Sequence, residues 1–212
     1  MKKMKYILPV VALCLLGAIT THAQESNVTR FGVKGGANFS NFRVDELEDN
    51  NVKAGLNLGL FMKLPVSEAV AIQPELLYSS KGAKLSYDNF VQGEGEYRFN
   101  FNYLELPVMG VFHIGDVFNI QVGPYISYLT SANIKNLDDD LDIQDIADLD
   151  EGDFNRFDYG LAAGIGFDFN GFIIGARYTH GFKEVGESGS IAGEFTKNSK
   201  NSVGTIFIGF GF

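Results

Sequence analysis

The fold is decided by the stretch Val52-Lys53-Ala54-Gly55-Leu56-Asn57-Leu58-Gly59-Leu60-Phe61-Met62-Lys63-Leu64. Every second residue from Val52 to Leu64 is apolar, and the positions between them carry mostly lysine, glycine and asparagine. A period of two is the pattern of a β-strand with one apolar and one polar face. The stretch is also long enough to cross a bilayer as a tilted strand. It therefore predicts a strand that lies between lipid and a polar interior.

Seven further segments repeat this alternation on either side of the deciding stretch. They cover residues 30–40, 70–78, 97–112, 118–128, 157–169, 172–179 and 201–212. Asn170-Gly171, between two of them, is the strongest two-residue signal for a β-hairpin. Because no comparable stretch has a helical period, the sequence predicts an all-β protein with eight strands.

One of these segments changes its phase. Its first aromatic residues are in phase with one another: Tyr97, Phe99, Phe101 and Tyr103. From Leu104 onward the apolar phase is shifted by one residue, and a β-bulge near Tyr103 or Leu104 would explain the shift. With that bulge, Glu105 faces the same side as Glu75 instead of lipid. We therefore expect a bulge here, with the early aromatic residues facing outward.

The connections between the segments alternate in length. Residues 65–68, 115–116 and 170–171 form short connections, whereas residues 41–51, 82–96, 131–153 and 183–200 form long polar ones. Short periplasmic turns and long external loops are the rule for bacterial outer-membrane barrels. The sequence therefore predicts an eight-stranded antiparallel up-and-down transmembrane β-barrel, located in the outer membrane.

The soluble alternative is a lipocalin-like barrel, in which the apolar face would line a ligand cavity. That arrangement would crowd Phe, Tyr and Leu side chains from every strand into a narrow lumen. It would also expose a face rich in glycine. The membrane barrel explains the pattern better.

The N-terminus has the features of a secretory signal. Three lysines among the first five residues are followed by an apolar stretch over residues 6–19 and by a small residue, Ala23. We therefore expect a signal peptide at 1–23 and a barrel domain at 24–212. The only cysteine, Cys14, lies within the signal, so the mature domain is expected to have no disulfides.

Charge and composition exclude one class of partner. The chain carries a formal net charge of -9, and its basic residues are not clustered after the N-terminus. A surface that binds nucleic acid needs clustered lysine and arginine, so nucleic acid is not expected as a partner. The expected partners are outer-membrane lipid, the outer-membrane assembly machinery and an unidentified protein contacted through the external loops. No cofactor and no metal are expected.

Four blocks of sequence occur in a recognisable order: Phe31-Gly32-Val33-Lys34-Gly35-Gly36-Ala37-Asn38, Gln73-Pro74-Glu75-Leu76-Leu77-Tyr78, Tyr103-Leu104-Glu105-Leu106-Pro107 and Gly175-Ala176-Arg177-Tyr178. Together they resemble the PorT-like family of outer-membrane β-barrel proteins, over nearly the whole mature chain. The resemblance implies an outer-membrane barrel. The founding member of that family is associated with protein secretion and gingipain maturation, but no motif here ties such a role to particular residues.

Six charged residues fall on the polar faces of the predicted strands and are expected to form an interior network: Arg30, Lys34, Glu75, Glu105, Asp158 and Arg177. Pairing inside the barrel would offset the cost of burying these charges. Such a network can plug the lumen or gate a pore. We prefer the plug, because the lumen of an eight-stranded barrel is only wide enough for its own side chains. A narrow channel or a transport or secretion accessory is the alternative.

The last segment carries Ile208, Phe210 and Phe212 in phase at the end of the chain. This pattern resembles the C-terminal strand signal that the assembly machinery reads. The alternative is an ordinary terminal strand, and we prefer the assembly signal because the rest of the chain has the barrel pattern.

The connection over residues 138–153 is rich in aspartate, but its spacing does not match the EF-hand pattern for calcium. A solvated acidic loop is the better interpretation.

Catalysis has little support in the sequence. His113 and His180 are expected at opposite ends of the barrel, and the common nucleophile and phosphate-binding motifs are absent. Pairing of His180 with Ser188 or Ser190 in a lipid-modifying enzyme is the remaining catalytic alternative. We expect a non-enzymatic integral barrel whose external loops contact a partner, or which supports the envelope.

Overall fold

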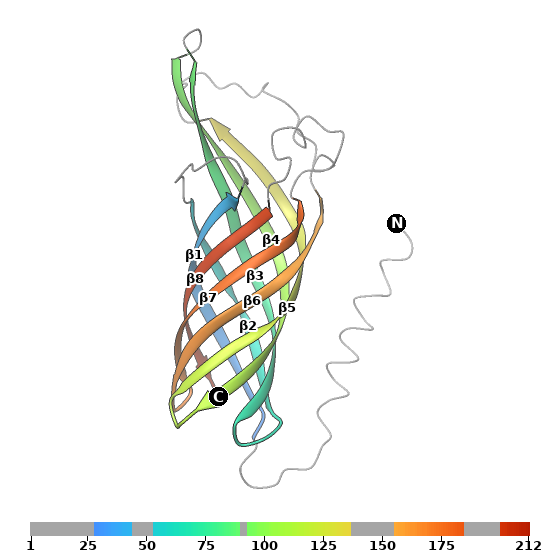
Figure 1. Ribbon diagram of the computed structural model, residues 1–212, viewed down its shortest axis with the longest axis vertical. Coiled ribbons are helices and arrows are strands. Elements are labelled where there is room, and N and C mark those ends of the chain that lie inside the picture. The colour runs from blue at the N-terminus through green and yellow to red at the C-terminus, as the bar shows by residue number, and fades with distance from the viewer. Residues whose placement is uncertain (1–27, 44–52, 90–92, 137–154, 185–199) are drawn as a thin grey trace, which may run out of the picture.

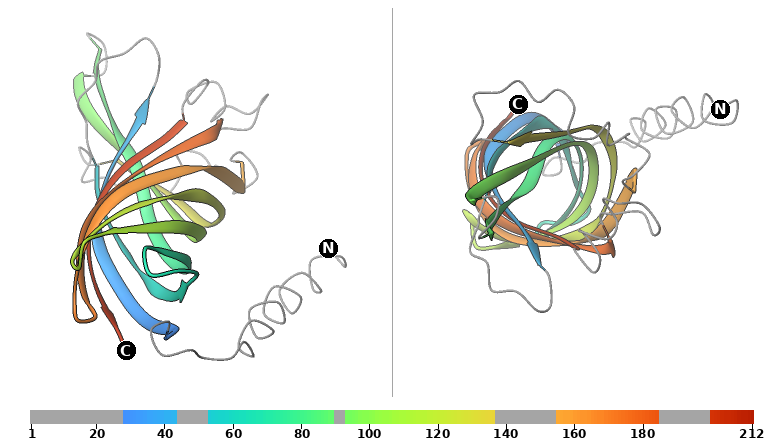
Figure 2. Two further views of the ribbon diagram at one scale, coloured as in Figure 1. Left: turned by 60° about the horizontal axis from the view of Figure 1, so that its bottom comes forward. Right: turned by 90° about the horizontal axis from the view of Figure 1, so that it is seen from above.

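The computed structural model describes residues 28–43, 53–89, 93–136, 155–184 and 200–212 of the chain. These residues form eight strands: β1 (Arg30–Arg43), β2 (Lys53–Pro65), β3 (Val70–Asn89), β4 (Gly93–Ile114), β5 (Phe118–Asn136), β6 (Phe157–Phe169), β7 (Phe172–Glu184) and β8 (Lys200–Gly211). Each strand pairs antiparallel with its neighbours, and β1 pairs with β8, so the sheet closes into a barrel (Figures 1 and 2). The predicted eight-stranded antiparallel barrel is confirmed. No helix among the described residues is long and apolar enough to cross a membrane.

The two faces of the strands are divided as the alternation predicts. On β2 the leucines at 56, 58 and 60 lie on the outer wall, while Lys53, Asn57 and Lys63 are buried in the lumen. The same division holds along β6, where Asp158 faces inward and Tyr159 faces outward. Apolar side chains therefore cover the outside, which excludes the lipocalin-like arrangement with its apolar lumen.

One end of the barrel holds the short turns, the start of β1 and the end of β8, and we call it the short-turn end (Figure 1). At its tightest turn Asn170 has φ 54° and Gly171 has φ 96°. Two successive positive φ angles are those of a type I′ hairpin, which matches the twist of the flanking strands. At the same end Phe31 and Phe212 exchange backbone hydrogen bonds of 3.2 and 2.7 Å, which close β1 against β8. We call the opposite end the long-loop end.

At the long-loop end β3 and β4 extend well beyond the predicted strands. They stay paired from Lys81 with Phe101 to Asn89 with Gly93, and β5 pairs with β4 as far as Asn136 with Tyr97. The prediction of a polar loop over residues 82–96 is therefore wrong for most of its length. We use the name projecting sheet for residues 83–89 of β3, 93–100 of β4 and 131–136 of β5 (Figure 1).

The predicted bulge is present at the expected height but on a different strand. Asn102 pairs with Ser131 and Tyr103 pairs with Leu129, so the extra residue is Thr130 of β5. The Thr130 hydroxyl donates a hydrogen bond of 2.8 Å to the backbone carbonyl oxygen of Asn102. The bulge thus interrupts the β4–β5 register without interrupting the alternation of β4.

Two aromatic side chains of β4 lie on the opposite face from the one predicted. Phe101 is 0% exposed and Tyr103 is 1% exposed, and both share the inward phase of Glu105. The prediction that they face outward is wrong, because an aromatic ring fits a crowded lumen as well as it fits lipid. Glu105 is therefore inside the barrel without any change of phase in β4.

Candidate functional site

The centre of the lumen is occupied by an ion-pair cluster built around Glu75 of β3. Both carboxylate oxygens of Glu75 accept hydrogen bonds from the guanidinium of Arg177, at 2.7 and 2.8 Å. Lys34 also donates to Glu75, at 3.1 Å, and the Gln73 side chain donates at 2.7 Å. The Glu75 side chain is 0% exposed. A carboxylate buried this deeply is tolerable only with several charge-assisted hydrogen bonds, and Glu75 has them.

The two cations of this cluster also lie against an aromatic ring. The Lys34 Nζ atom is 3.8 Å from the centroid of the Phe207 ring, and the Arg177 guanidinium carbon is 5.4 Å from it. Arg177 donates a further hydrogen bond of 2.7 Å to the side-chain oxygen of Gln121. The ring of Phe207 thus fills space in the lumen and stabilises both cations electrostatically.

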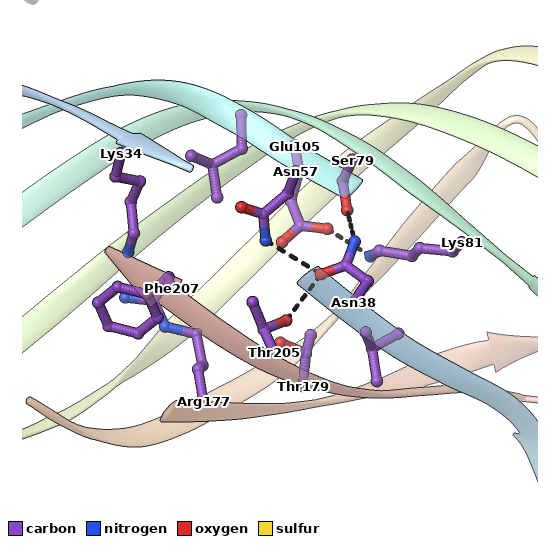
Figure 3. A pocket seen from close by; sticks show the side chains of 12 residues that line it. Lys34, Asn38, Asn57, Ser79, Lys81, Glu105, Arg177, Thr179, Thr205 and Phe207 are labelled. Carbon is purple, nitrogen blue, oxygen red and sulfur yellow. Dashed lines mark hydrogen bonds and ion pairs between the residues drawn. The ribbon is translucent and has the colours of Figure 1, made fainter. Parts of the chain in front are cut away.

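On the long-loop side of this cluster lies a layer of neutral hydrogen bonds centred on Asn38 (Figure 3). The Asn38 side-chain oxygen accepts from Asn57 at 3.0 Å and from Thr205 at 2.8 Å. Its side-chain nitrogen donates to the Ser79 hydroxyl and to the Ser80 carbonyl, both at 3.0 Å. These four bonds use the full capacity of the amide and join β1 to β2, β3 and β8.

Closer still to the long loops lies a second ion pair, between Lys81 and Glu105. The Lys81 Nζ atom lies 5.3 Å from the ring centroid of Tyr103 and 5.1 Å from that of Tyr125. Asp158 is nearby, and its Oδ2 atom accepts hydrogen bonds from the Tyr125 hydroxyl at 3.0 Å and from Asn201 at 2.9 Å. The inward rings of β4 and β5 thus surround the buried ammonium group.

A third polar cluster closes the short-turn end. Lys63 donates to Asp168 at 2.8 Å and lies 3.2 Å from His113 Nε2. The other oxygen of Asp168 accepts from the backbone nitrogen of Gly171 at 3.1 Å. Asp168 therefore ties the Asn170-Gly171 turn to a lysine inside the barrel.

The six residues of the predicted network are placed as follows. Lys34, Glu75 and Arg177 form one cluster, and Glu105 is inside with a different partner, Lys81. Asp158 is also inside, but its Oδ2 atom accepts from the neutral groups of Tyr125 and Asn201, and its Oδ1 atom has no hydrogen-bond partner. The placement of Arg30 in the interior is wrong, because it is the first residue of β1 and its side chain is exposed at the rim.

The sequence-based network omitted Lys63, Lys81 and Asp168. A signal for all three was present, since each lies in phase with the other inward residues of its strand. Lys81 was missed because the expected strand covered only residues 70–78, whereas β3 continues through Lys81 to Asn89. The alternation of inward and outward residues also cannot show which inward charges lie at the same height in the lumen.

What remains open between these clusters is a cavity of about 10 Å³ lined by Lys34, Asn57, Arg177 and Thr205 among others (Figure 3). That volume is at the lower limit for a single water molecule. No group of three or more potential metal-ligating side chains was found in the described part of the chain. The arrangement thus favours a rigid plug over a path for solutes.

The outer wall carries an aromatic belt near the long-loop end. Its ring pairs are Tyr128 with Phe157, Tyr159 with Phe182, and Tyr178 with His180, at centroid distances of 5.1, 6.3 and 6.5 Å. Girdles of aromatic residues lie at the membrane interfaces of outer-membrane barrels. The belt therefore indicates where the membrane ends on this side.

The side chains of the predicted assembly signal also lie on the outer wall. Ile208, Phe210 and Phe212 are all exposed, Phe212 at 73%. This placement is compatible with an ordinary lipid-facing strand as well, so recognition by the assembly machinery stays a prediction.

His180 has a partner other than the two serines considered from the sequence. Its Nδ1 atom lies 3.3 Å from the hydroxyl of Ser202, which also accepts a hydrogen bond of 3.3 Å from Tyr178. Ser188 and Ser190 lie outside the described residues, as does the acidic connection 138–153. No carboxylate of the described residues contacts His180, so they do not supply the usual third member of a catalytic triad.

Among the solved structures that resemble this chain, the match to one surface protein supports the fold. The chain is similar to Neisserial surface protein A (NspA), with 9% identity, a TM-score of 0.51 and coverage of 86% of this chain and 97% of that one. It is also similar to Ail, the attachment invasion locus protein of Yersinia pestis, with 14% identity, a TM-score of 0.46 and coverage of 86% and 98%. The outer membrane enzyme PagL matches with 12% identity, a TM-score of 0.40 and coverage of 84% and 98%. Identities this low concern the fold alone.

A search of curated proteins found no match. Residues 22–186 match the family described as outer membrane protein beta-barrel domain. This match spans most of the chain and agrees with the closed eight-stranded sheet and its apolar outer wall. The chain therefore belongs to the outer membrane protein β-barrel domain family, and the protein is located in the outer membrane.

Proposed function

We propose that this protein is a non-enzymatic outer-membrane barrel that holds its long-loop end outside the cell for contact with a partner. The observation that carries the proposal is the projecting sheet, in which β3, β4 and β5 stay paired beyond the described residues of the strands that flank them. By the rule for bacterial outer-membrane barrels, the short turns face the periplasm and the long connections face outward. The projecting sheet would then extend away from the membrane.

The filled lumen supports an anchoring role for the barrel. The clusters around Glu75 and Lys63 join strands that are distant in sequence, β3 with β1 and β7, and β2 with β6. Such a plug would resist deformation when a partner pulls on the external end. The cavity between these clusters is only about 10 Å³, which counts against the narrow channel considered from the sequence.

The charge of the external segments indicates what kind of partner would fit. Residues 44–52, 90–92, 137–154 and 185–199 together contain fifteen acidic residues and one lysine. Segments with this composition attract cationic surfaces and repel anionic ones over about a Debye length, ~8 Å at physiological salt. We therefore propose a partner with a basic surface.

The PorT-like resemblance is a narrower form of this proposal. It would make the partner a component of a protein-secretion apparatus. The four blocks that carry the resemblance contribute side chains to the lumen and outer wall, and none of them belongs to the projecting sheet. The contact role does not depend on that assignment.

A photo-crosslinking experiment on intact cells tests the proposal. A benzophenone amino acid replaces Tyr87, in the projecting sheet, or Val66, which is exposed in a short turn. At position 87 we expect adducts with proteins that are supplied in the medium or carried by neighbouring cells. At position 66 we expect no such adducts. As a control, a variant with residues 83–99 replaced by Asn-Gly should still fold in detergent. Absence of adducts at position 87, or the same adducts at both positions, would contradict an external contact role.

A further inference from the structure

The outer wall carries a groove of about 620 Å³ where β1 lies between β2 and β8. Gly35 of β1 forms its floor, because it shares the outward phase of Val33 but has no side chain. In the sheet Gly35 is paired with Leu58 on one side and with Ile208 on the other. The exposed side chains that line the groove are all apolar: Val33, Leu56, Leu58, Phe172, Ile208 and Phe210.

The groove offers no polar side chain to a ligand. Lys34 and Asn57 also border it, but their side chains are buried on the luminal side of the wall. The backbone at Gly35 is already paired with strands on both sides. A ligand that follows the groove must therefore be hydrocarbon along its length of contact, since a polar group buried there without a partner would be costly.

The direction of the groove follows from the stagger of the strands. A path that steps between paired residues, from Leu64 of β2 through β3 to β8 and then β1, returns to β2 at Ala54. It has moved from position 64 to position 54, toward the long-loop end. Eight steps of about 4.8 Å across the sheet and ten residues of about 3.3 Å along it give a strand tilt of ~40° to the barrel axis. Each step from β1 toward β2 therefore also rises toward the long loops (Figure 1).

With this tilt the groove runs parallel to the barrel axis. Leu56 lies one strand from Gly35 toward β2 and two residues nearer the long loops, while Phe210 lies one strand away on the other side and two residues nearer the short turns. The two displacements add along the axis and nearly cancel around the barrel. From Leu56 to Phe210 the groove thus extends over ~17 Å along the axis. Phe172, which follows the Asn170-Gly171 turn, brings it to the short-turn end.

These features suit one acyl chain of a bilayer lipid. Acyl chains lie on average along the membrane normal, which is the direction of the groove. The hydrocarbon core is ~30 Å thick, so the groove is about as long as one leaflet is deep. By the rule for bacterial barrels the short turns face the periplasm, so the open lower end lies at the level of the periplasmic headgroups.

A second copy of the chain fits the groove less well. A two-fold interface brings the same patch of both copies together. Two concave surfaces would then face each other across Gly35, and the floor of each groove would stay unfilled.

We propose that the groove over Gly35 binds one acyl chain of a glycerophospholipid from the periplasmic leaflet. The chain contacts the protein on the floor and on both walls of the groove, whereas lipid elsewhere on the wall contacts it on one side. The lipid in the groove should therefore exchange more slowly than its neighbours. This inference does not depend on the external contact role.

A photoreactive phospholipid tests the site. The mature protein is reconstituted in nanodiscs that contain a small fraction of phosphatidylethanolamine with a diazirine in the middle of one acyl chain. After irradiation, adducts are mapped by peptide mass spectrometry. We expect adducts on residues 33–36, 56–58 and 208–210 to exceed those on residues 108–112, an outward-facing part of β4, by about tenfold.

Gly35→Ile fills the groove, and Gly110→Ile is the matched control on another part of the wall. A Cβ atom at either glycine would have its nearest neighbours at 3.4 Å, so both positions accept a side chain. Excluding the acyl chain from contact over two methylene groups should lower the groove adducts about tenfold in Gly35→Ile. Gly110→Ile should be labelled as the wild type is. Gel mobility without boiling shows that both variants are folded.

Three results would overturn the proposal. Equal labelling of the groove and of residues 108–112 in the wild type would mean that only ordinary surrounding lipid is present, and this comparison needs no variant. Undiminished groove labelling in a folded Gly35→Ile would place the bound chain elsewhere. Dimers in native mass spectrometry that are lost in Gly35→Ile, together with weak labelling of the groove, would assign the groove to a second copy.

Discussion

Arg177 of β7 and Glu75 of β3 lie on opposite walls of the barrel and are joined across the lumen by two hydrogen bonds of 2.7 and 2.8 Å. They are 102 residues apart in the chain, and three strands separate them on either side of the closed sheet. Lys34 of β1 shares the same carboxylate. Ion pairs therefore connect opposite walls of the barrel across the lumen. The loss of stability expected from removing each charged partner can be ranked.

Glu75→Gln should destabilise the barrel more than Arg177→Met does. The first change leaves two buried cations without a carboxylate, whereas the second leaves Glu75 still paired with Lys34. Breaking a buried pair costs about 3–5 kcal/mol, and we expect Glu75→Gln in that range. The free energy of unfolding of both variants is measured by urea titration in detergent micelles, with the folded fraction read from gel mobility without boiling. Glu68→Gln in an exposed turn is the control, and an equal loss in all three variants would contradict the ranking.

The wild-type protein should conduct no ions in a planar lipid bilayer. Its central cavity of about 10 Å³ cannot hold a hydrated ion. Replacing Phe207 and Arg177 together by alanine removes the ring and the guanidinium that fill this level of the lumen, and we expect discrete conductance steps from that variant. Steps of similar size from the wild type would show that the plug opens.

Gly160→Ala should destabilise the barrel, while Gly110→Ala should not. A Cβ atom at Gly160 would clash with the backbone carbonyl of His180 and would lie 2.8 Å from a ring carbon of Tyr125. At Gly110 the nearest atoms would be 3.4 Å away, an ordinary contact. Forcing an extra methyl group into a packed interior costs about 1–3 kcal/mol. The melting temperatures of the two variants are compared by gel mobility in detergent. Equal melting temperatures would contradict close packing at Gly160.

Ser202 should not react as a catalytic nucleophile. It lies beside His180, but no carboxylate of the described residues contacts that histidine, and the Tyr178 hydroxyl donates to Ser202. We expect no labelling of the nanodisc-embedded protein by a fluorophosphonate probe, and unchanged envelope lipids in cells that carry Ser202→Ala. Labelling that is lost specifically in Ser202→Ala would replace the contact role by a hydrolytic one.

Much of the lumen could be predicted from the alternation alone. Lys34, Glu75, Glu105, Asp158 and Arg177 all face inward as expected, because a period of two assigns every residue of a strand to one face once a single residue is placed. The rule fails at the end of a strand. Arg30 has the inward phase, but it is the first residue of β1 and lies at the rim of the barrel, where its side chain is exposed.

The alternation also misleads where both environments accept the same side chain. Phe101 and Tyr103 are apolar enough for lipid, and their phase appeared to break at Leu104. In the barrel they line the lumen, where the Tyr103 ring lies near Lys81. Hydrophobicity alone could not distinguish these two positions. The pairing of Tyr103 with Leu129, one residue out of step with that of Asn102 and Ser131, belongs to the β4–β5 contact and not to β4 itself.

The sequence by itself determined that this protein is a membrane barrel, how many strands it has, and, for most strand residues, which side chains face lipid and which face the lumen. Those properties follow from local alternation and from turn residues such as Asn170 and Gly171. Only the tertiary structure decided that Glu75 pairs with Arg177, that Lys81 pairs with Glu105, and that β3 and β4 stay paired as far as Asn89 with Gly93. Each of these depends on the stagger between strands, since closure of the barrel sets the height of every residue relative to the opposite wall.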